Sequence, residues 1–391
     1  MRALSERAPA SDDRAQAEAL AKSVAAWFAA GHRDLPWRRT RDPYAVWVSE
    51  VMLQQTRVDT VAPRFTRWMQ RFPSVAALAE APLDDVLAEW SGLGYYARAR
   101  NLHAAARIVA EEHDGKIPDD EAGISALPGI GRYTTGAILS IAYGKKAPIL
   151  DGNVERVLAR VFRVEGDPRH GRTRDRLWQL AAEVAGTDED PSHVNQGLME
   201  LGALVCSPKR PACLACPVTS VCSARRHGDA ESLPNPTAKV KVSAVEQVTI
   251  ALVRDGKVLL ARRPPEGLWG GLFELPSGEP LVGETPLSAA RRIAKEKVGL
   301  TIEAALPLPA PNDRFVQELT HLRVTFHAFR AEAPRTRVKR SGYDAHEWID
   351  LERARLLGIA RATQRLLSAL SVMEAGERRT RREIAFQRRL T

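Results

Sequence analysis

The sequence contains no long apolar segment. No uncharged run among its 391 residues approaches the ~18 apolar residues that a membrane-spanning helix needs. The first twenty residues also lack the apolar core of a secretory signal, because charges recur throughout them. These charged residues are Arg2, Glu6, Arg7, Asp12, Asp13 and Arg14. We therefore expect a cytoplasmic protein that does not bind membranes.

Cysteine is scarce. The four cysteines all lie between residues 206 and 222, with the spacing C-x6-C-x2-C-x5-C. Because thiols stay reduced in the cytoplasm, such a cluster favours a metal site over disulfide bonds. Four thiolates can hold zinc or an iron–sulfur cluster, and the spacing alone leaves both open. The candidate ligands are Cys206, Cys213, Cys216 and Cys222.

Acidic residues are outnumbered by basic ones, 48 against 57, which gives a formal charge of +9. This excess favours a polyanionic partner such as nucleic acid, although an ordinary basic protein can show the same balance. No internal repeat is visible, and the length exceeds that of one ordinary hydrophobic core. We expect two domains.

The first half of the chain lacks alternating apolar and polar residues. Residues 15–225 instead show helical periodicity, for example in the apolar stripe of 154, 157, 158, 161 and 162. Residues 226–245 lose this period and carry two prolines, which predicts a linker. This pattern indicates an all-α domain over 15–225.

The period changes after residue 246. Two aliphatic runs joined by Asp255-Gly256 predict a β-hairpin, and Leu322–Phe329 predicts a further strand. Residues 286–298 and 351–370 have helical patterns. We expect an α+β domain over 246–370 and a basic tail over 371–391, disordered from residue 378.

The phrase "LPGIGRYTTGAI" predicts two helices joined by a tight hairpin. Pro128 ends the first helix, and Gly129 and Gly131 permit a close turn. The second helix begins near Arg132 and ends at Gly144. Exposed N–H groups at such a turn can bind a phosphate, although short G-x-G turns are common.

Two carboxylates stand in contrasting surroundings. Asp151 precedes a periodic helix and is expected to cap it, which favours its charged form. Glu50 shares a helix face with Val46, Trp47 and Leu53, so burial should raise its pKa. Such a pair can cleave a glycosidic bond, with Glu50 as the acid and Asp151 beside the sugar cation. The alternatives are a purely structural cap and a glutamate paired with an arginine.

Several phrases in one order give residues 34–225 a resemblance to a known family. They are "LPWRR", "WVSEVMLQQT", "GLGYYARARNLH", "LPGIGRYTTGAI", "LDGNVERVLAR" and the cysteine loop. Together they resemble the MutY-type adenine DNA glycosylases of the endonuclease III, helix-hairpin-helix superfamily. The resemblance implies a 4Fe–4S cluster on the four cysteines. It also implies a monomer that binds double-stranded DNA with A·8-oxoguanine or A·G mispairs and extrudes the adenine.

The resemblance also implies residue roles. Glu50 corresponds to the acid, Asp151 to the sugar-facing carboxylate and Asn153 to its positioning partner. Residues that match pocket positions around the adenine are Trp37, Arg38 and Gln196. Residues that match the wedge on the oxidised-guanine side are Gln55, Leu93 and Tyr95. The hairpin glycines Gly129 and Gly131 correspond to the DNA-binding turn.

Tyr133 stands where endonuclease III relatives place a lysine that attacks the sugar. A phenol cannot form a Schiff base, so we expect a monofunctional glycosylase. The Tyr133 hydroxyl is expected to hydrogen-bond near Asp151 or the sugar intermediate. A bifunctional glycosylase and AP lyase of the endonuclease III kind is the alternative.

The second domain, which contains "GLWGGLFELPSG", resembles the Nudix fold. A working Nudix box reads R-E-U-x-E-E-x-G-U, where U is aliphatic, but Ile293 and Lys297 replace two of its three acids. A nucleotide pyrophosphohydrolase is therefore not expected, because a hard cation needs clustered oxygen ligands.

The family recognises 8-oxoguanine through a Phe-Ser-His loop, and this chain has Leu319-Thr320-His321 there. Thr320 and His321 are the candidate contacts. A non-catalytic DNA-binding module is the remaining alternative, and the presence of both Glu50 and Asp151 argues against it.

Overall fold

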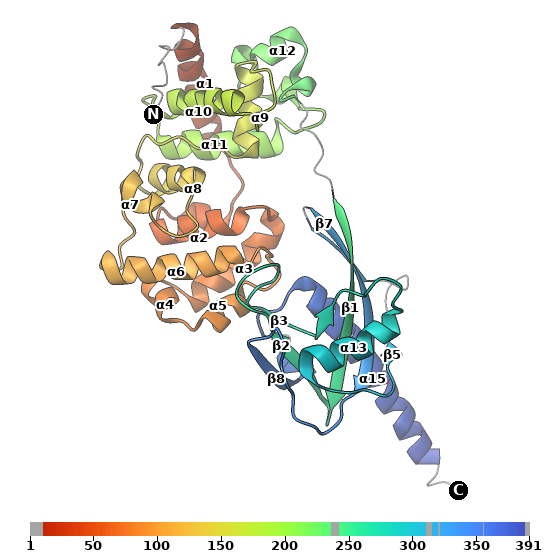
Figure 1. Ribbon diagram of the computed structural model, residues 1–391. Coiled ribbons are helices and arrows are strands. Elements are labelled where there is room, and N and C mark those ends of the chain that lie inside the picture. Colours follow the sequence, from red (N-terminus) through yellow and green to blue (C-terminus); the bar gives the residue numbers. More distant parts are fainter. Residues whose placement is uncertain (1–10, 236–241, 310–314, 320, 355, 388–391) are drawn as a thin grey trace. The chain divides into compact units, whose positions relative to one another are not determined.

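The computed structural model describes residues 11–235, 242–309, 315–319, 321–354 and 356–387 (Figure 1). The chain forms two compact units. Unit 1 comprises Met1–Glu80 and Asn101–Ala238, and unit 2 comprises Ala81–Arg100 and Lys239–Thr391. The sequence placed a boundary at 226–245, but it did not predict that residues 81–100 fold with the C-terminal part.

Unit 1 is helical throughout its described residues, as predicted. Its α-helices are α1 (Ser11–Ala30), α2 (Pro43–Leu53), α3 (Val58–Arg71), α4 (Val75–Glu80), α6 (Ala97–Glu112, which begins in unit 2), α7 (Glu121–Ser125), α8 (Arg132–Ala137), α9 (Gly152–Val161), α10 (Gly171–Ala185), α11 (Pro191–Leu204) and α12 (Ser223–His227). Single turns of other helix types include η1 (Pro36–Arg39), a 3₁₀ turn, and η2 (Ile138–Ala142), a π turn.

The core of unit 1 includes the helices α1, α9, α10 and α11, which pack against one another (Figure 1). The apolar stripe predicted on α9 is buried at Val154, Val157, Leu158 and Val161. Helix α11 packs against α9 and contributes fully buried side chains such as Leu201. Burial of this stripe, rather than local propensity alone, fixes α9 and therefore the position of Asp151 at its start.

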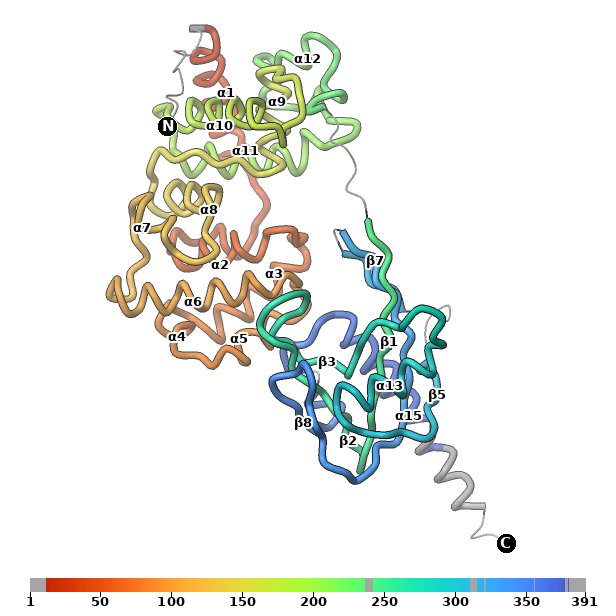
Figure 2. Tube along the Cα trace, viewed as in Figure 1, coloured from red at the N-terminus to blue at the C-terminus, as the bar shows by residue number. Residues whose placement is uncertain are grey.

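Unit 2 contains an eight-stranded sheet. Its strands are β1 (Ser243–Arg254), β2 (Lys257–Arg262), β3 (Phe273–Glu274), β4 (Ser277–Gly278), β5 (Leu306–Pro307), β6 (Phe315–Glu318), β7 (Leu322–Glu332) and β8 (Ala345–Asp350). The central order is β3-β2-β1-β7-β5, while β8 pairs with β2, β4 with β1 and β6 with β7. Strands β1 and β7 run parallel, from Ser243 opposite Leu322 to Val253 opposite Glu332 (Figure 2).

Helices cover both faces of this sheet. The α-helices of unit 2 are α5 (Leu83–Glu89), α13 (Pro286–Val298), α14 (Leu351–Ala354) and α15 (Arg361–Gln387). Val248, Ile250 and Leu252 of β1 pack with α13, whereas the alternate residues Ala251 and Val253 join the core that includes α15. This alternation follows from the two-residue period of a strand and gives three layers.

The mixed α and β character of this unit agrees with the sequence, and several elements are confirmed. The hairpin turns at Asp255 and Gly256, whose φ angles are 52° and 77°. The strand predicted at 322–329 is β7, and the helix predicted at 286–298 is α13. Thr285 caps α13 by accepting a hydrogen bond from the Ser288 N–H group at 3.3 Å.

Two predictions at the C-terminal end are wrong. The helix expected over 351–370 is interrupted between α14 and α15, because Gly358 accepts a hydrogen bond from the Phe273 N–H group of β3 and Ile359 bridges to the same strand. The tail expected to be disordered from 378 is instead helical to Gln387. Glu374 anchors α15 through an ion pair with Arg330 at 2.9 Å. Residues 388–391 lie outside the described part.

None of the described helices has the length and apolar composition needed to cross a bilayer.

Candidate active site

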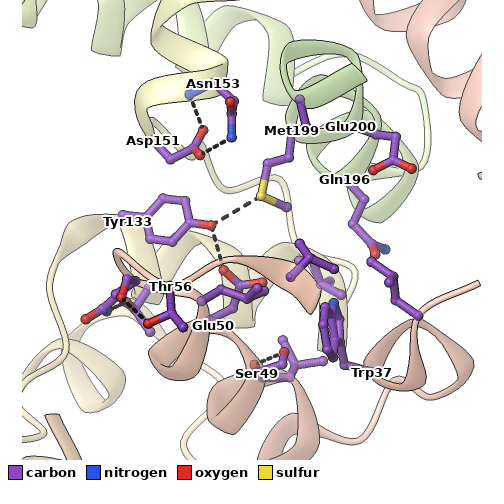
Figure 3. A pocket seen from close by; sticks show the side chains of 18 of the residues that line it. Trp37, Ser49, Glu50, Thr56, Tyr133, Asp151, Asn153, Gln196, Met199 and Glu200 are labelled. Carbon is purple, nitrogen blue, oxygen red and sulfur yellow. Dashed lines mark hydrogen bonds between the residues drawn. The ribbon is translucent and has the colours of Figure 1, made fainter. Parts of the chain in front are cut away.

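A cavity of about 620 Å³ lies within unit 1 (Figure 3). Its walls come from η1, α2, α8, α11 and the start of α9. It brings together many of the residues selected from the sequence. These are Trp37, Arg38, Glu50, Gln55, Gly131, Tyr133, Asp151, Asn153 and Gln196. Gly129, Leu93, Tyr95, His321 and the four cysteines do not line this cavity.

Glu50 is buried on α2, with a side chain in the wall of the cavity and a residue exposure of 4%. Helix α2 is fixed by Asp42, whose carboxylate accepts hydrogen bonds from the N–H groups of Tyr44 and Ala45. Burial raises the pKa of Glu50 to about 7, and the negative charge of Asp151 acts in the same direction. The prediction of a raised pKa is confirmed, and Glu50 can hold a proton near neutral pH.

The hydroxyl of Tyr133 donates a hydrogen bond to Oε2 of Glu50 at 2.6 Å (Figure 3). A second contact joins this hydroxyl to the Met199 sulfur at 3.2 Å. Tyr133 was expected to hydrogen-bond near Asp151 or the sugar intermediate, and the structure gives Glu50, on the same cavity as Asp151, as its partner. The bond opposes the effect of burial and holds the pKa of Glu50 lower than burial alone would.

Asp151 caps α9 as predicted. Its Oδ1 accepts hydrogen bonds from the N–H groups of Asn153 at 3.1 Å and Val154 at 2.8 Å. Its Oδ2 accepts one from the Asn153 side-chain amide at 3.0 Å (Figure 3). Three N–H donors at the start of the helix fix the orientation of this carboxylate.

Arg156 supports this arrangement from the next turn of α9, a contact that the sequence analysis missed. Its guanidinium donates to the Asn153 side-chain oxygen at 2.9 Å and to the Gly202 carbonyl at 2.7 Å. Its Nε donates to the Cys206 carbonyl at 2.7 Å. The sequence did indicate this contact, because Arg156 lies three residues after Asn153 and side chains at that spacing are neighbours on a helix.

Glu200 is the principal site residue that sequence reasoning did not find. It lines the cavity from α11 with an exposure of 1%, and it forms ion pairs with Arg33 and Arg38. Burial alone would raise the pKa of Glu200, but the hydrogen bonds from Arg33 and Arg38 lower it to about 2. The only local indication in the sequence was that Glu200 lies four residues after Gln196, a predicted pocket residue, and therefore on the same helix face.

The predicted hairpin joins α7 to α8. Gly129 has a φ angle of 77°, and a Cβ atom there would lie 2.6 Å from the Cβ of Asn101, so this position requires glycine. The second helix begins at Arg132, continues through η2 to Ala142 and is followed by Gly144 at a φ angle of 65°. The hairpin and the role of Gly129 agree with the sequence prediction, whereas Gly131 has a φ angle of −104° and open space at its Cβ position, so it does not require glycine.

Comparison with known proteins shows the family. The profile of the HhH-GPD superfamily of base excision DNA repair proteins matches residues 48–183, and that of the NUDIX domain matches residues 248–369. Adenine DNA glycosylase of Homo sapiens is 36% identical over 375 residues, covering 81% of this chain and 67% of the relative. The chain belongs to the adenine DNA glycosylase family.

Two further adenine DNA glycosylases support this assignment. The Rattus norvegicus protein is 46% identical over 223 residues, or 55% of this chain and 43% of the relative. The Buchnera aphidicola protein from Schizaphis graminum is 34% identical over 270 residues, or 69% of this chain and 76% of the relative. The match thus spans less than half of the rat protein.

The four cysteines of this adenine DNA glycosylase family member line one small cavity. The buried guanidinium of Arg160 fixes the loop by donating to the Cys206 sulfur at 3.3 Å and the Ser207 carbonyl at 2.8 Å. Within the described ranges, no group of Cys, His, Asp or Glu side chains is arranged around a single metal ion. Four thiols gathered on one cavity are soft ligands of the kind that hold zinc or an iron–sulfur cluster.

Three of the four DNA-contact residues predicted in unit 2 lie within the described part of the structure. Tyr95 is 48% exposed and Leu93 is buried, and both belong to the segment 81–100. His321 is exposed at the start of β7, and its carbonyl accepts a hydrogen bond from the Ser243 N–H group at 2.9 Å. Thr320 lies outside the described residues.

On α13, Ile293 is part of the hydrophobic core, with 1% exposure. Arg292 forms ion pairs with Glu284 at 2.8 Å and with Glu296 at 3.0 Å. Glu284 and Glu296 are therefore paired with one arginine, Arg292.

Proposed function

We propose that the protein is a monofunctional DNA glycosylase that excises adenine opposite 8-oxoguanine in duplex DNA. The observation that carries this proposal is the pairing of Glu50 and Asp151 on one cavity. Among the described residues, Glu50 has the Tyr133 hydroxyl as its hydrogen-bond partner, and its pKa is about 7. Asp151 is held by three N–H donors. Their opposite environments suit an acid and a charge-stabilising group.

In the proposed reaction the adenosine is extruded from the duplex into the cavity of unit 1. Glu50 donates its proton to a ring nitrogen of the adenine, and the C1′–N bond breaks with its electron pair going to the base. Asp151 stabilises the positive charge that develops on the sugar, as an ion pair or as a covalent ester. Water then adds at C1′ and returns a proton to Glu50.

Acid catalysis typically contributes 10²–10⁴-fold, about 3–5 kcal/mol, whereas glycosylases must lower the barrier by at least ~8 kcal/mol. The remainder must come from Asp151 and from the exclusion of water. Asn153 acts as a positioning residue for Asp151 through its side-chain amide, and Arg156 acts through Asn153.

The base pocket is proposed to consist of Trp37, Arg38 and Gln196, together with Glu200. Trp37 offers an aromatic wall with 6% exposure, and Gln196 offers both a donor and an acceptor. Glu200 accepts hydrogen bonds from Arg33 and Arg38, so it holds the Arg38 guanidinium in the wall of this pocket.

The absence of strand cleavage is proposed from the chemistry of the cavity wall. Among its described lining residues there is no lysine. By the resemblance to endonuclease III relatives, Tyr133 corresponds to the lysine that attacks the sugar. A phenol bonded to Glu50 cannot form a Schiff base. We expect Tyr133→Lys to permit borohydride trapping on DNA. Strong trapping by the unaltered protein would support the bifunctional alternative.

Duplex DNA is the proposed partner of both units, with the protein acting as a monomer. The turn at Gly129 and Gly131 would bind a backbone phosphate, and Gln55, Leu93 and Tyr95 would form the wedge. The loop that contains Thr320 and His321 would read 8-oxoguanine. The Nudix-like domain, proposed over 246–370, would thus serve recognition rather than hydrolysis.

A 4Fe–4S cluster is proposed on Cys206, Cys213, Cys216 and Cys222. When bound, such a cluster supplies thiolate–iron bonds that fix the fold of the loop. Arg160 and Arg156 of α9 donate hydrogen bonds to Cys206 and would fix the position of this loop relative to α9. Iron and sulfide analysis of protein purified without oxygen tests this assignment, and stoichiometric zinc would contradict it.

The deciding experiment is single-turnover excision on a duplex with one A·8-oxoguanine pair, with and without hot alkali. We expect strand breaks only after alkali, because a glycosylase without lyase activity leaves an intact abasic strand. Breaks without alkali would contradict the monofunctional assignment. No alkali-labile product would contradict the glycosylase itself and favour a binding module.

A further inference from the structure

The segment Ala81–Arg100 belongs in sequence to the catalytic half of the chain, but it folds as part of unit 2. Its main anchor is Tyr96, which is buried at 5% exposure. The Tyr96 hydroxyl donates a hydrogen bond to the carbonyl of Ile359 at 2.7 Å. Ile359 is fully buried and bridges to Phe273 of β3. The segment is thus tied to the sheet of unit 2.

Further contacts surround this anchor. Gln364 of α15 donates to the Ser91 hydroxyl at 2.6 Å, and Ser91 in turn donates to the Ile359 carbonyl at 3.5 Å. Gly358 passes so close to α5 that a Cβ atom there would lie 2.9 Å from the Cβ of Leu87. The C-terminal residues that interrupt the predicted helix over 351–370 are therefore the ones that hold the segment.

Between these anchors the backbone adopts an unusual conformation. Gly92 and Gly94 have φ angles of 89° and 73°, and Tyr95 has a φ angle of 47°. A left-handed conformation at a bulky residue costs free energy and persists only where the surroundings impose it. The surroundings include Trp90, whose indole N–H donates to the Gly94 carbonyl at 3.0 Å.

Arg98 completes the support of this loop. Its guanidinium donates to the carbonyls of Leu93 and Gly94 at 3.1 Å each and lies 5.7 Å from the centre of the Tyr95 ring. Burial lowers the pKa of Arg98 to about 10, so the side chain stays charged at neutral pH. The Tyr95 ring is held yet half exposed, as a side chain that inserts into a base stack must be.

We infer that the C-terminal part of unit 2 sets the conformation of the Tyr95 loop, with Tyr96 as a positioning residue that fixes the Tyr95 ring relative to the lesion-reading domain. This inference rests on the proposed function, in which Tyr95 enters the base stack. Recognition of the oxidised guanine and insertion of the Tyr95 ring would then be performed by one folded unit. A change at the Tyr96–Ile359 contact should therefore weaken action on a stacked pair.

The test compares Tyr96→Phe with Tyr143→Phe, a matched control. The Tyr143 hydroxyl also donates to a backbone carbonyl, that of Ile117, at 2.6 Å, but it lies in unit 1 and does not line the active-site cavity. Each variant is assayed in single turnover on two duplexes. One carries A·8-oxoguanine, and the other carries adenine opposite a tetrahydrofuran abasic analogue, where no opposing base resists extrusion.

For Tyr96→Phe we expect about a tenfold loss on A·8-oxoguanine, which corresponds to ~1.4 kcal/mol, and little loss on the abasic duplex. Tyr143→Phe should show no such difference between the duplexes. Equal losses of Tyr96→Phe on both duplexes would overturn the inference. If the unaltered protein releases no adenine from either duplex, the proposed function itself fails, so the two failures are distinguishable.

A double-mutant cycle separates positioning from general destabilisation. With Tyr95→Ala already present, Tyr96→Phe should cause no further loss, because the side chain that it positions is gone. Additive losses would overturn the inference. Should Tyr96→Phe not fold, Gln364→Met replaces it, since this change removes the hydrogen bond to Ser91 from the C-terminal side and should show the same dependence on Tyr95.

Discussion

Glu50 in the cavity of unit 1 and Glu296 on helix α13 of unit 2 are carboxylates in opposite environments. In the cavity Glu50 is buried with a tyrosine hydroxyl as its hydrogen-bond partner. On α13 the side chain of Glu296 is 56% exposed and is paired with Arg292. At a neighbouring position of that helix, an aliphatic residue, Ile293, lies in the core.

The difference shows that a buried carboxyl group, which is unfavourable to ionise, is present in the cavity and not on α13. A buried carboxyl without a cation destabilises the fold when it ionises, and its pKa rises as a result. An exposed carboxylate beside an arginine costs little and stays charged, but it has no proton to give at neutral pH. The first arrangement suits acid catalysis, and the second suits a surface that has lost its catalytic acids.

The largest expected effect is that of Glu50→Gln on adenine release. The amide keeps the shape of the side chain but has no acidic proton, so excision should fall by about 10²–10⁴-fold. Binding to the A·8-oxoguanine duplex should remain within a few-fold. Single-turnover rates and a binding titration measure the two quantities, and undiminished turnover would remove Glu50 from the mechanism.

A second prediction concerns the free energy of unfolding. The pKa of Glu50 is about 7 when folded and near 4.5 when unfolded, so the folded state binds more protons between these values. The contribution of Glu50 to stability is therefore fully present below about pH 4.5 and is lost as pH rises through about 7. The loss amounts to roughly 3 kcal/mol at most.

Urea unfolding of the unaltered protein and of Glu50→Gln at pH 5 and pH 8 isolates this contribution, because other groups titrate equally in both. Relative to the unaltered protein, Glu50→Gln should gain stability on going from pH 5 to pH 8. A stability difference that does not change with pH would mean that Glu50 is ionised throughout, contrary to the comparison drawn above.

Tyr133→Phe should have a smaller effect. Its hydrogen bond lowers the pKa of Glu50, so its removal should raise that pKa and shift the alkaline limb of the pH–rate profile to higher pH. We also expect about a tenfold lower rate at the optimum, from loss of one hydrogen bond. A limb that moves to lower pH would show that Tyr133 does not act through Glu50.

The environments of Glu50 and Asp151 could be predicted from the local sequence. The α2 pattern places Val46 and Trp47 one turn before Glu50, which is enough to predict burial and a raised pKa. Asp151 before the periodic α9 is enough to predict a cap. Both inferences depend only on neighbours within one helix, where spacing determines which side chains meet.

Contacts made across the fold could not be predicted in this way. Glu200 meets Arg33, which lies 167 residues earlier in the chain, and Tyr96 meets Ile359, 263 residues later. No periodicity connects residues so far apart. The same reason explains the wrong helix over 351–370, because the pairing of Gly358 and Ile359 with β3 overrides the local helical pattern.

The smallest expected effect is that of Glu296→Gln on α13. Exposed ion pairs contribute about 0.2–1 kcal/mol, so thermal stability should change little and adenine release not at all. Neither the variant nor the unaltered protein should hydrolyse 8-oxo-dGTP when Mg²⁺ is added, because the described residues of this unit offer no cluster of oxygen ligands. If Mg²⁺-dependent hydrolysis occurs and Glu296→Gln abolishes it, α13 is catalytic. The contrast between a working carboxylate in unit 1 and a neutralised one in unit 2 then no longer holds.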